Sequence, residues 1–199
     1  MLLYEESSRK YFVCSACDLA FLAPADRLSP DQEKSRYLEH NNDINDWRYR
    51  NFVRPLFDQV RQHVGQGASG LDFGSGTGPV LAEMLRENGY KISLFDSFFH
   101  TAGENLRQTY DFIVACEVVE HFFNPAEEFQ RFRKMLHDSG VLGIMTLLWY
   151  DGLDFANWHY RRDPTHVVFY SQATFQWIQK RFGFSEVSFP TDRVVLLRT

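Results

Sequence analysis

The chain has 199 residues, 44% of them hydrophobic, which is enough apolar content for one domain with a full core. Its 21 Lys plus Arg against 26 Asp plus Glu give a net charge of −5, which disfavours a general electrostatic grip on nucleic acid and favours small-molecule partners. No hydrophobic run approaches the roughly 20 residues that span a bilayer, the N-terminus lacks a signal-peptide core, and three cysteines give no disulfide framework. We therefore expect a cytoplasmic protein with no membrane partner.

The most specific motif is the glycine-rich segment at 70–78, Gly-Leu-Asp-Phe-Gly-Ser-Gly-Thr-Gly. Glycine at every second position after an apolar strand end allows a tight turn whose amide groups approach a ligand closely. A dinucleotide fingerprint requires glycine at position 79, where this chain has Pro79, a residue suited to a first helical turn. The pattern predicts a strand, a nucleoside-binding turn and a helix over 79–88. A tight turn without a ligand is the alternative.

The next two predicted strands place acidic residues at the same edge of the expected sheet. Residues 90–95 form a short strand followed by Asp96, at the distance from the glycine turn where an open α/β sheet hydrogen-bonds a ribose diol. Residues 110–116 are an apolar run typical of a parallel strand buried on both faces, and Glu117 follows it. Because ligands of such sheets bind beyond the carboxyl ends of the strands, we expect these segments to converge on one rim.

The rest of the chain continues the alternation of helices and strands. A helix opens at Asn124-Pro125 and closes at Ser139-Gly140, and a buried strand follows at 141–148. After an aromatic, irregular stretch, Ser171 caps a helix that ends at Gly183. Two terminal strands are expected at roughly 184–189 and 193–198. This alternation predicts an α/β fold with a doubly wound, mostly parallel sheet.

Together these motifs resemble the class I S-adenosylmethionine (SAM)-dependent methyltransferases over roughly residues 50–199. The segments that carry the resemblance are 71–78, Asp96 and 110–121. It implies a Rossmann-like sheet with an antiparallel last strand, SAM as the cofactor and S-adenosylhomocysteine (SAH) as its product. In the family, the glycine turn, the acid after the second strand and the residues after the fourth strand hold the cofactor. By position, the cofactor-binding residues are Asp72, Gly74, Ser75, Gly76, Gly78, Asp96, Ser97, Phe98, Cys116 and Glu117.

The chain departs from the family between Asp96 and Tyr110, where only 13 residues stand. The family places a helix, a third strand and a loop with an acidic adenine contact in this interval, which is too short for all three. We therefore expect a missing or vestigial helix and a degraded third strand. The adenine would rest against Ser97, Phe98 or Phe99. In the alternative, Phe98 and Phe99 only cover the sheet where the helix is absent.

The N-terminal residues 1–30 are expected to form an appendage. They contain Cys14 and Cys17 and look like the second half of a zinc ribbon that precedes the catalytic domain in some related bacterial methyltransferases. A closed structural zinc site needs four ligands, and this motif supplies two. The prediction is a relic β-hairpin that packs its apolar residues and holds no metal. The alternative is a zinc site that a histidine or a second chain completes.

Residues 31–64 are polar with a helical pattern, and 65–199 form the predicted catalytic domain. Helices ahead of the catalytic domain cover the cofactor in the resembling family. Tyr37 and His40 are therefore candidate contacts, and a plain packing helix is the alternative.

Two histidines are candidate catalytic residues, because methyl transfer needs alignment and, for an acceptor that loses a proton, a base. His121 follows the fourth-strand motif, where the family often keeps a structural histidine, and His166 lies in an aromatic segment, 155–170, where the family builds its acceptor pocket. The candidate acceptor contacts there are His159, Arg161 and Arg162. In the alternative, Asp163 pairs with an arginine and His166 caps the loop.

The predicted function is methyl transfer from SAM to a small-molecule acceptor, with oxygen slightly favoured because of these histidines. A non-catalytic SAM- or SAH-binding module is one alternative. An RNA or protein methyltransferase is the other, but it requires a basic stripe beside the pocket, and the cluster of Arg48, Arg50 and Arg54 is diluted by neighbouring aspartates.

Overall fold

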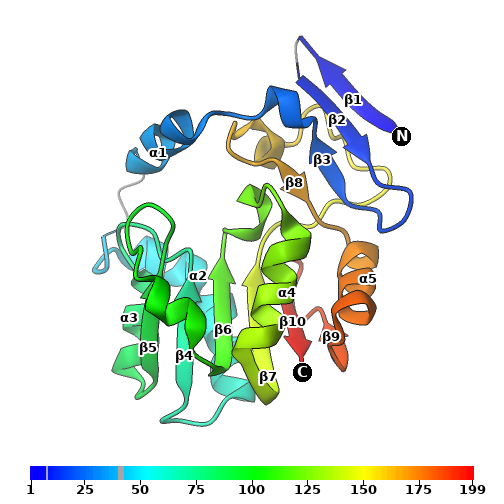
Figure 1. Ribbon diagram of the computed structural model, residues 1–199. Helices are drawn as coiled ribbons and strands as arrows, with labels where there is room; N and C mark the ends of the chain where they lie inside the picture. Colours follow the sequence, from blue (N-terminus) through cyan, green and yellow to red (C-terminus); the bar gives the residue numbers. More distant parts are fainter. Residues whose placement is uncertain (8, 40–42) are drawn as a thin grey trace.

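The computed structural model describes residues 1–7, 9–39 and 43–199. Its central sheet has six strands in the order β5-β4-β6-β7-β10-β9 (Figure 1). The strands are β4 (Ser69–Phe73), β5 (Lys91–Phe95), β6 (Tyr110–Cys116), β7 (Leu136–Met145), β9 (Glu186–Ser188) and β10 (Val194–Arg198). The first four are parallel, whereas β10 runs antiparallel to both β7 and β9. The predicted mostly parallel sheet with an antiparallel end is confirmed.

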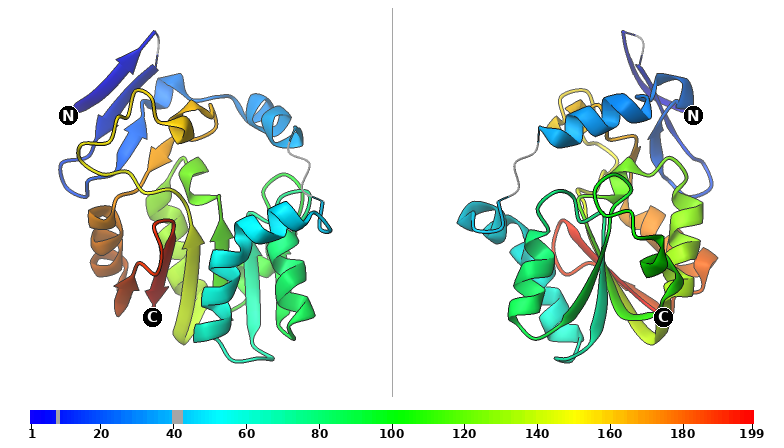
Figure 2. Two further views of the ribbon diagram at one scale, coloured as in Figure 1. Left: turned by 180° about the vertical axis from the view of Figure 1, so that it is seen from behind. Right: turned by 60° about the vertical axis from the view of Figure 1, so that its left-hand side comes forward.

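Helices cover both faces of this sheet (Figure 2). α2 (Trp47–His63) and α3 (Val80–Glu87) pack on one face, and α4 (Pro125–Met135) and α5 (Gln172–Phe182) pack on the other. The alternation along β6 explains the two layers: Phe112 and Val114 join the core under α2 and α3, while Ile113 and Ala115 join the core under α4 and α5. Every second residue of a strand faces the same side, so an all-apolar strand supplies both cores.

The interval between β5 and β6 lacks the helix and the third strand that its short length was predicted to exclude. It holds the 3-10 helix η2 (Gly103–Arg107) and an isolated bridge between Asp96 and His100, with no α-helix or third strand in 97–109. The side chain of Asn105 donates to the carbonyl of Leu94 at 2.9 Å and so fastens this segment to β5. Because no third strand pairs with it, β5 is an edge strand of the central sheet.

The boundary between α4 and β7 differs from the sequence prediction. The helix ends at Met135 and the strand begins at Leu136, not after Ser139-Gly140. Leu136 pairs with Tyr110 of β6, and the amide of Gly140 donates to the side chain of Thr199, so sheet contacts override the local turn signal. Ser139 still takes the left-handed backbone conformation, φ 64°, as an irregularity inside the strand.

A second, smaller sheet lies above the carboxyl ends of the central strands (Figure 1). It is antiparallel and consists of β1 (Leu2–Glu6), β2 (Arg9–Val13), β3 (Ala20–Leu22) and β8 (Val168–Phe169). The expected N-terminal hairpin therefore gains a strand from far along the chain. The division of the chain at residue 30 stays a prediction. No helix among the described residues is long and apolar enough to cross a membrane.

Candidate active site

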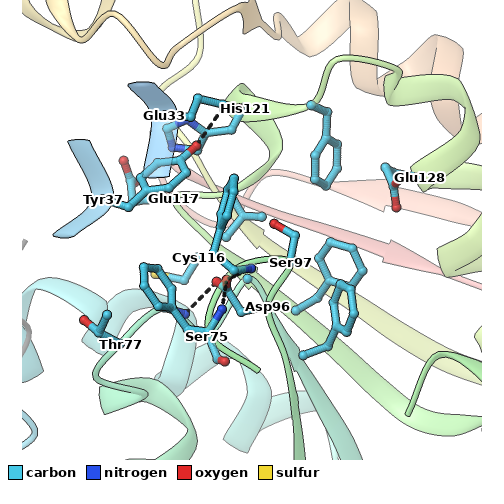
Figure 3. Close-up of a pocket in the computed structure, with 18 of the residues that line it drawn as sticks. Glu33, Tyr37, Ser75, Thr77, Asp96, Ser97, Cys116, Glu117, His121 and Glu128 are labelled. Atoms are coloured by element: carbon cyan, nitrogen blue, oxygen red, sulfur yellow. Dashed lines mark hydrogen bonds between the residues drawn. The ribbon is translucent and has the colours of Figure 1, made fainter. Parts of the chain in front are cut away.

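A cavity of about 730 Å³ opens beyond the carboxyl ends of β4, β5 and β6 (Figure 3). The glycine turn after β4 and the segment after β5 form one side of it, and the residues after β6 form another. Helix α1 (Pro30–Leu38) lies over the opening and contributes Glu33 and Tyr37. The three segments that the sequence placed on one rim line this cavity.

The glycine turn holds a backbone shape that only glycine takes without strain. Gly74 and Gly76 have φ values of 78° and 63°. A Cβ atom at Gly74 would also lie 2.4 Å from a methyl carbon of Val118. The amides of Gly74 and Ser75 both donate to the carbonyl of Phe95, at 2.7 and 3.1 Å, which ties the turn to the end of β5. The turn is thus a fixed cradle with little side chain above it.

Asp96 fixes the same turn from the other side. Its Oδ2 accepts from the amide of Gly76 at 3.0 Å, and its Oδ1 accepts from the amides of Phe98 and Phe99 at 2.8 and 3.1 Å. A carboxylate has about four acceptor positions, so Oδ2 keeps one for a ligand hydroxyl. Because Asp96 lines the cavity, its position suits a ribose hydroxyl of the cofactor.

Two further acids stand at the end of β6. Glu117 lines the cavity in the left-handed conformation, φ 52°, which is uncommon for a residue with a side chain. Glu120, on the 3-10 helix η3 (Val119–His121), is fully buried. The hydroxyl of Tyr160 lies 3.0 Å from Oε2 of Glu117 and 2.5 Å from Oε1 of Glu120, and Thr146 donates to Oε2 of Glu120 at 3.1 Å.

This pair of acids is hard to ionise fully. Burial, and then the charge of Glu117, raise the pKa of Glu120 well above its ordinary value. Burial also raises the pKa of Glu117. The hydroxyl of Tyr160 has one proton and donates it to one carboxylate at a time. The negative charge of the other carboxylate must be balanced by a bound proton or by another cation.

His121 and His166 meet at the wall of the cavity next to these acids. Their ring centroids are 4.8 Å apart. Nδ1 of His121 lies 2.9 Å from the carbonyl of Thr165, and Nδ1 of His166 lies 2.7 Å from the carbonyl of Tyr160. The ring of Tyr37 covers His121 edge-on at 5.3 Å. The structure thus brings both predicted histidines into the cavity that the glycine turn lines.

Two predicted cofactor residues support the cavity without lining it. Asp72 is 3% exposed and lies at the end of β4, directly before the turn. Burial raises the pKa of Asp72 to about 7. Gly78 is buried, and its carbonyl accepts from the amide of Val80 where the helix begins. The remaining predicted cofactor residues, Gly74, Ser75, Gly76, Asp96, Ser97, Phe98, Cys116 and Glu117, all line the cavity.

The predicted acceptor contacts of the loop before β8 need correction. Arg161 is 4% exposed and points away from the cavity: it donates to the carbonyls of Phe155 and Ala156 and forms an ion pair with Glu6 at 3.0 Å. Arg162 and His159 are exposed and do not line the cavity. The reason is that η4 (His159–Arg162) turns these side chains toward the N-terminal sheet and solvent.

The same loop shows which arginine pairs with Asp163. Arg36 of α1 donates to Oδ2 of Asp163 at 3.1 Å. Burial opposes ionisation of Asp163, but the hydroxyl and amide of Thr165 outweigh it and, with Arg36, lower the pKa of Asp163 to about 2. The ion pair fastens α1 over the cavity. His40, the other predicted contact next to α1, lies outside the described residues.

Sequence reasoning missed several side chains of the site. Glu33 is only 8% exposed on an otherwise polar helix and accepts from the hydroxyl of Tyr37 at 3.1 Å. Its spacing of four residues from Tyr37 was a usable signal. Glu120 and Tyr160 gave no comparable signal, because their meeting depends on the loop between β7 and β8. Tyr49 and Phe52 reach the cavity from α2.

The doubly wound sheet, the rigid glycine turn and the acid after β5 define a class I SAM-dependent methyltransferase. A family model described as "Methyltransferase domain" matches residues 25–188. The chain belongs to this methyltransferase-domain family. No curated protein sequence matches the chain.

Solved structures show the same fold at low identity. A 1,6-didemethyltoxoflavin-N1-methyltransferase of Burkholderia thailandensis, crystallised with 1,6-didemethyltoxoflavin and SAH, is 13% identical with a TM-score of 0.59, covering 100% of this chain and 98% of that one. An O-methyltransferase family protein of the same organism is 16% identical with a TM-score of 0.56, covering 83% and 61%. A phospholethanolamine N-methyltransferase 2 of Haemonchus contortus is 15% identical with a TM-score of 0.54, covering 68% and 38%.

Proposed function

We propose that the protein transfers the methyl group of SAM to an oxygen atom of a small molecule. The observation that carries this proposal is the pair His121 and His166, which lines the same cavity as the glycine turn. A hydroxyl acceptor must lose a proton during methyl transfer, and imidazoles near neutral pH are suited to assist that loss.

The residues fit the cofactor at the opposite end of the cavity. The glycine turn lines the cavity with little side chain above its backbone, and Asp96 keeps an acceptor position for a ribose hydroxyl. Phe98 and Phe99 offer apolar surface next to Asp96 for the adenine. Bound there, SAM supplies a methyl group on a positively charged sulfur, which is an excellent leaving group.

The chain's own residues then serve alignment and exclusion of water. Glu117 and Cys116 line the same cavity as the glycine turn and the histidines, and we propose that they flank the methyl group. α1 covers the acceptor end through Tyr37 and is held by the ion pair of Arg36 with Asp163. Alignment of this kind contributes up to roughly 7–11 kcal/mol in ideal cases.

The surface supports a small acceptor over a nucleic acid. Arg50, the central member of the one basic cluster that the sequence offered, forms an ion pair with Glu87 of α3. Its charge is therefore partly neutralised, and the net charge of the chain is −5. Helix α1 also covers the acceptor end of the cavity, which suits a small molecule that fits entirely inside and not a segment of a large polymer.

The test is methyl transfer from isotopically labelled SAM to a metabolite extract, followed by mass spectrometry. We expect a labelled small molecule whose added methyl sits on oxygen, and a loss of labelling of at least tenfold in His121→Ala, with His159→Ala as the matched control on an exposed imidazole. A label on nitrogen or carbon would overturn the choice of oxygen. A label on RNA or protein alone would overturn the small acceptor.

A further inference from the structure

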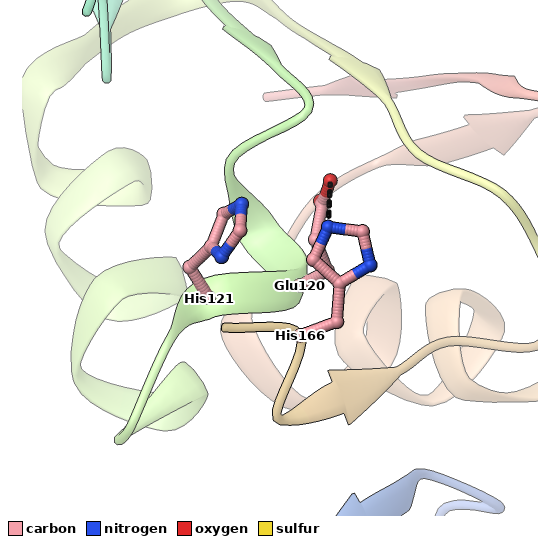
Figure 4. Close-up of side chains that lie close together, drawn as sticks. All are labelled: Glu120, His121 and His166. Atoms are coloured by element: carbon pink, nitrogen blue, oxygen red, sulfur yellow. Dashed lines mark ion pairs between the residues drawn. The ribbon is translucent and has the colours of Figure 1, made fainter. Parts of the chain in front are cut away.

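Two histidines of the cavity wall and one fully buried acid lie close enough together to hold a metal ion after side-chain rotation (Figure 4). One ligand atom from each of Glu120, His121 and His166 lies within 4.8 Å of the other two. Glu120 and His121 are adjacent on η3, and His166 comes from the loop before β8, so two distant segments converge here.

Hydrogen bonds orient both imidazoles as metal-binding histidines are oriented. A carbonyl oxygen only accepts, so Nδ1 of His121 carries the proton that it donates to Thr165, and Nδ1 of His166 carries the proton that it donates to Tyr160. In the neutral rings Nε2 therefore holds the lone pair. Donation of the other ring N–H to a backbone carbonyl is the usual support of a metal-ligating histidine.

The site also has an excess of buried acid. Within residues 1–7, 9–39 and 43–199, the one basic side chain within ion-pair distance of Glu120 is the imidazole of His166, with 4.0 Å between Nε2 and Oε1, and this ring carries a charge only when it is protonated. Oε1 of Glu117, buried beside the same cavity, has no hydrogen-bond partner among the described residues. Two buried carboxyl groups that share Tyr160 call for positive charge at this place.

The geometry points to a site for a divalent first-row transition-metal cation, such as Mn²⁺, Co²⁺ or Zn²⁺, held by Glu120, His121 and His166. Two imidazoles and one carboxylate favour these ions over Mg²⁺ and Ca²⁺, which prefer oxygen ligands alone. Bonds of about 2.1 Å bring ligand atoms to roughly 3.0–3.5 Å from one another. The ligand atoms lie up to 4.8 Å apart, so the widest pair must close by roughly 1.3–1.8 Å through side-chain rotation.

This site gives the two histidines a role other than that of a direct base, and this step rests on the proposed oxygen acceptor. His121 and His166 line the cavity, so the open side of the cation faces the acceptor. A hydroxyl bound there loses its proton more readily, and the proton leaves to solvent water. The oxygen lone pair forms the bond to the methyl carbon, and the electron pair of the sulfur–carbon bond stays on sulfur, leaving neutral SAH.

The test measures metal binding directly, without turnover. The protein, carrying Cys14→Ser to remove thiolate binding at the Cys-x-x-Cys turn, is stripped with EDTA and titrated with Co²⁺ by absorption spectroscopy and with Zn²⁺ by calorimetry. We expect one site per chain, weakened at least 100-fold in His121→Ala and in Glu120→Gln. His159→Ala is the matched control and should bind as the parent does.

Either of two outcomes would overturn the site: no metal uptake by the stripped parent, or a metal affinity that His121→Ala leaves within threefold of the parent. Glu120 is buried, so the Glu120→Gln variant could fail to fold. In that case His121→Ala decides whether the metal site exists, because His121 is partly exposed. SAH binding is measured on the same samples. Normal SAH binding without metal uptake rejects the metal site and leaves the methyltransferase function standing.

Discussion

Replacing Asp96 should separate its two tasks, holding the glycine turn and binding the cofactor. In Asp96→Ala three backbone amides, those of Gly76, Phe98 and Phe99, lose their acceptor. A buried donor without a partner costs about 1–3 kcal/mol. Because Asp96 is 9% exposed and water reaches its site, the lower end applies, and the free energy of unfolding should fall by about 3 kcal/mol. Asp96→Asn keeps an oxygen for two of these amides and should cost about 1–2 kcal/mol.

Both variants should lose the charge-assisted hydrogen bond to the cofactor. Such a bond contributes about 1.5–3 kcal/mol, so calorimetry should find SAH binding weakened by about 10–150-fold in each. Asp111→Asn is the matched control, because Asp111 accepts from the amide and hydroxyl of Ser69 at 2.8 and 2.9 Å at the opposite end of the sheet. It should lower stability in urea unfolding and leave SAH binding unchanged. SAH affinity within threefold of the parent in Asp96→Ala would show that Asp96 does not bind the cofactor.

Three further predictions concern the supporting residues. Gly74→Ala places a Cβ against Val118 at φ 78° and should lower the free energy of unfolding, measured in urea, by about 2–4 kcal/mol. The control is Gly89→Ala, which also has a positive φ but meets nothing within 4 Å, and which should cost about 1–2 kcal/mol. Burial raises the pKa of Asp72 to about 7 in the folded protein, whereas the unfolded chain releases this proton near 3.8. The free energy of unfolding should therefore fall by up to about 4 kcal/mol as pH rises from 4 to 7. Asp72→Asn should flatten this pH dependence, and an unchanged slope in the variant would contradict the raised pKa. Arg161→Met removes the ion pair of the buried Arg161 with the exposed Glu6 and two hydrogen bonds, and should lower the melting temperature without changing the KM of the acceptor. A raised KM alone would restore its predicted substrate role.

The sheet and the cofactor end were predictable because their signals are local. The apolar strands, the glycine turn and Asp96 can each be recognised from a few consecutive residues. A parallel sheet brings the carboxyl ends of its strands to one edge, so the turn and Asp96 meet there regardless of loop conformation. The short interval of 97–109 was equally readable, since length alone excluded a helix plus a strand. The α4 boundary was wrong because the pairing of Leu136 with Tyr110 is a contact between segments far apart in sequence.

The acceptor end was harder to predict for the same reason. Arg161 and His166 stand five residues apart, yet one packs under the N-terminal sheet and the other enters the cavity. The turn of η4 decides this, and η4 is placed by its contacts with that sheet. Glu120 has the sequence context of a surface acid and becomes fully buried only because Tyr160 and Thr146 meet its carboxyl group.

A crystal structure of the protein with SAH would show directly whether cofactor and acceptor meet in this cavity. We expect density for SAH in the cavity, with a ribose hydroxyl within hydrogen-bond distance of Oδ2 of Asp96 and the sulfur directed past Glu117 toward His121 and His166. Density for SAH elsewhere, or with its sulfur turned away from the histidines, would contradict the assignment of this cavity as the place where cofactor and acceptor meet.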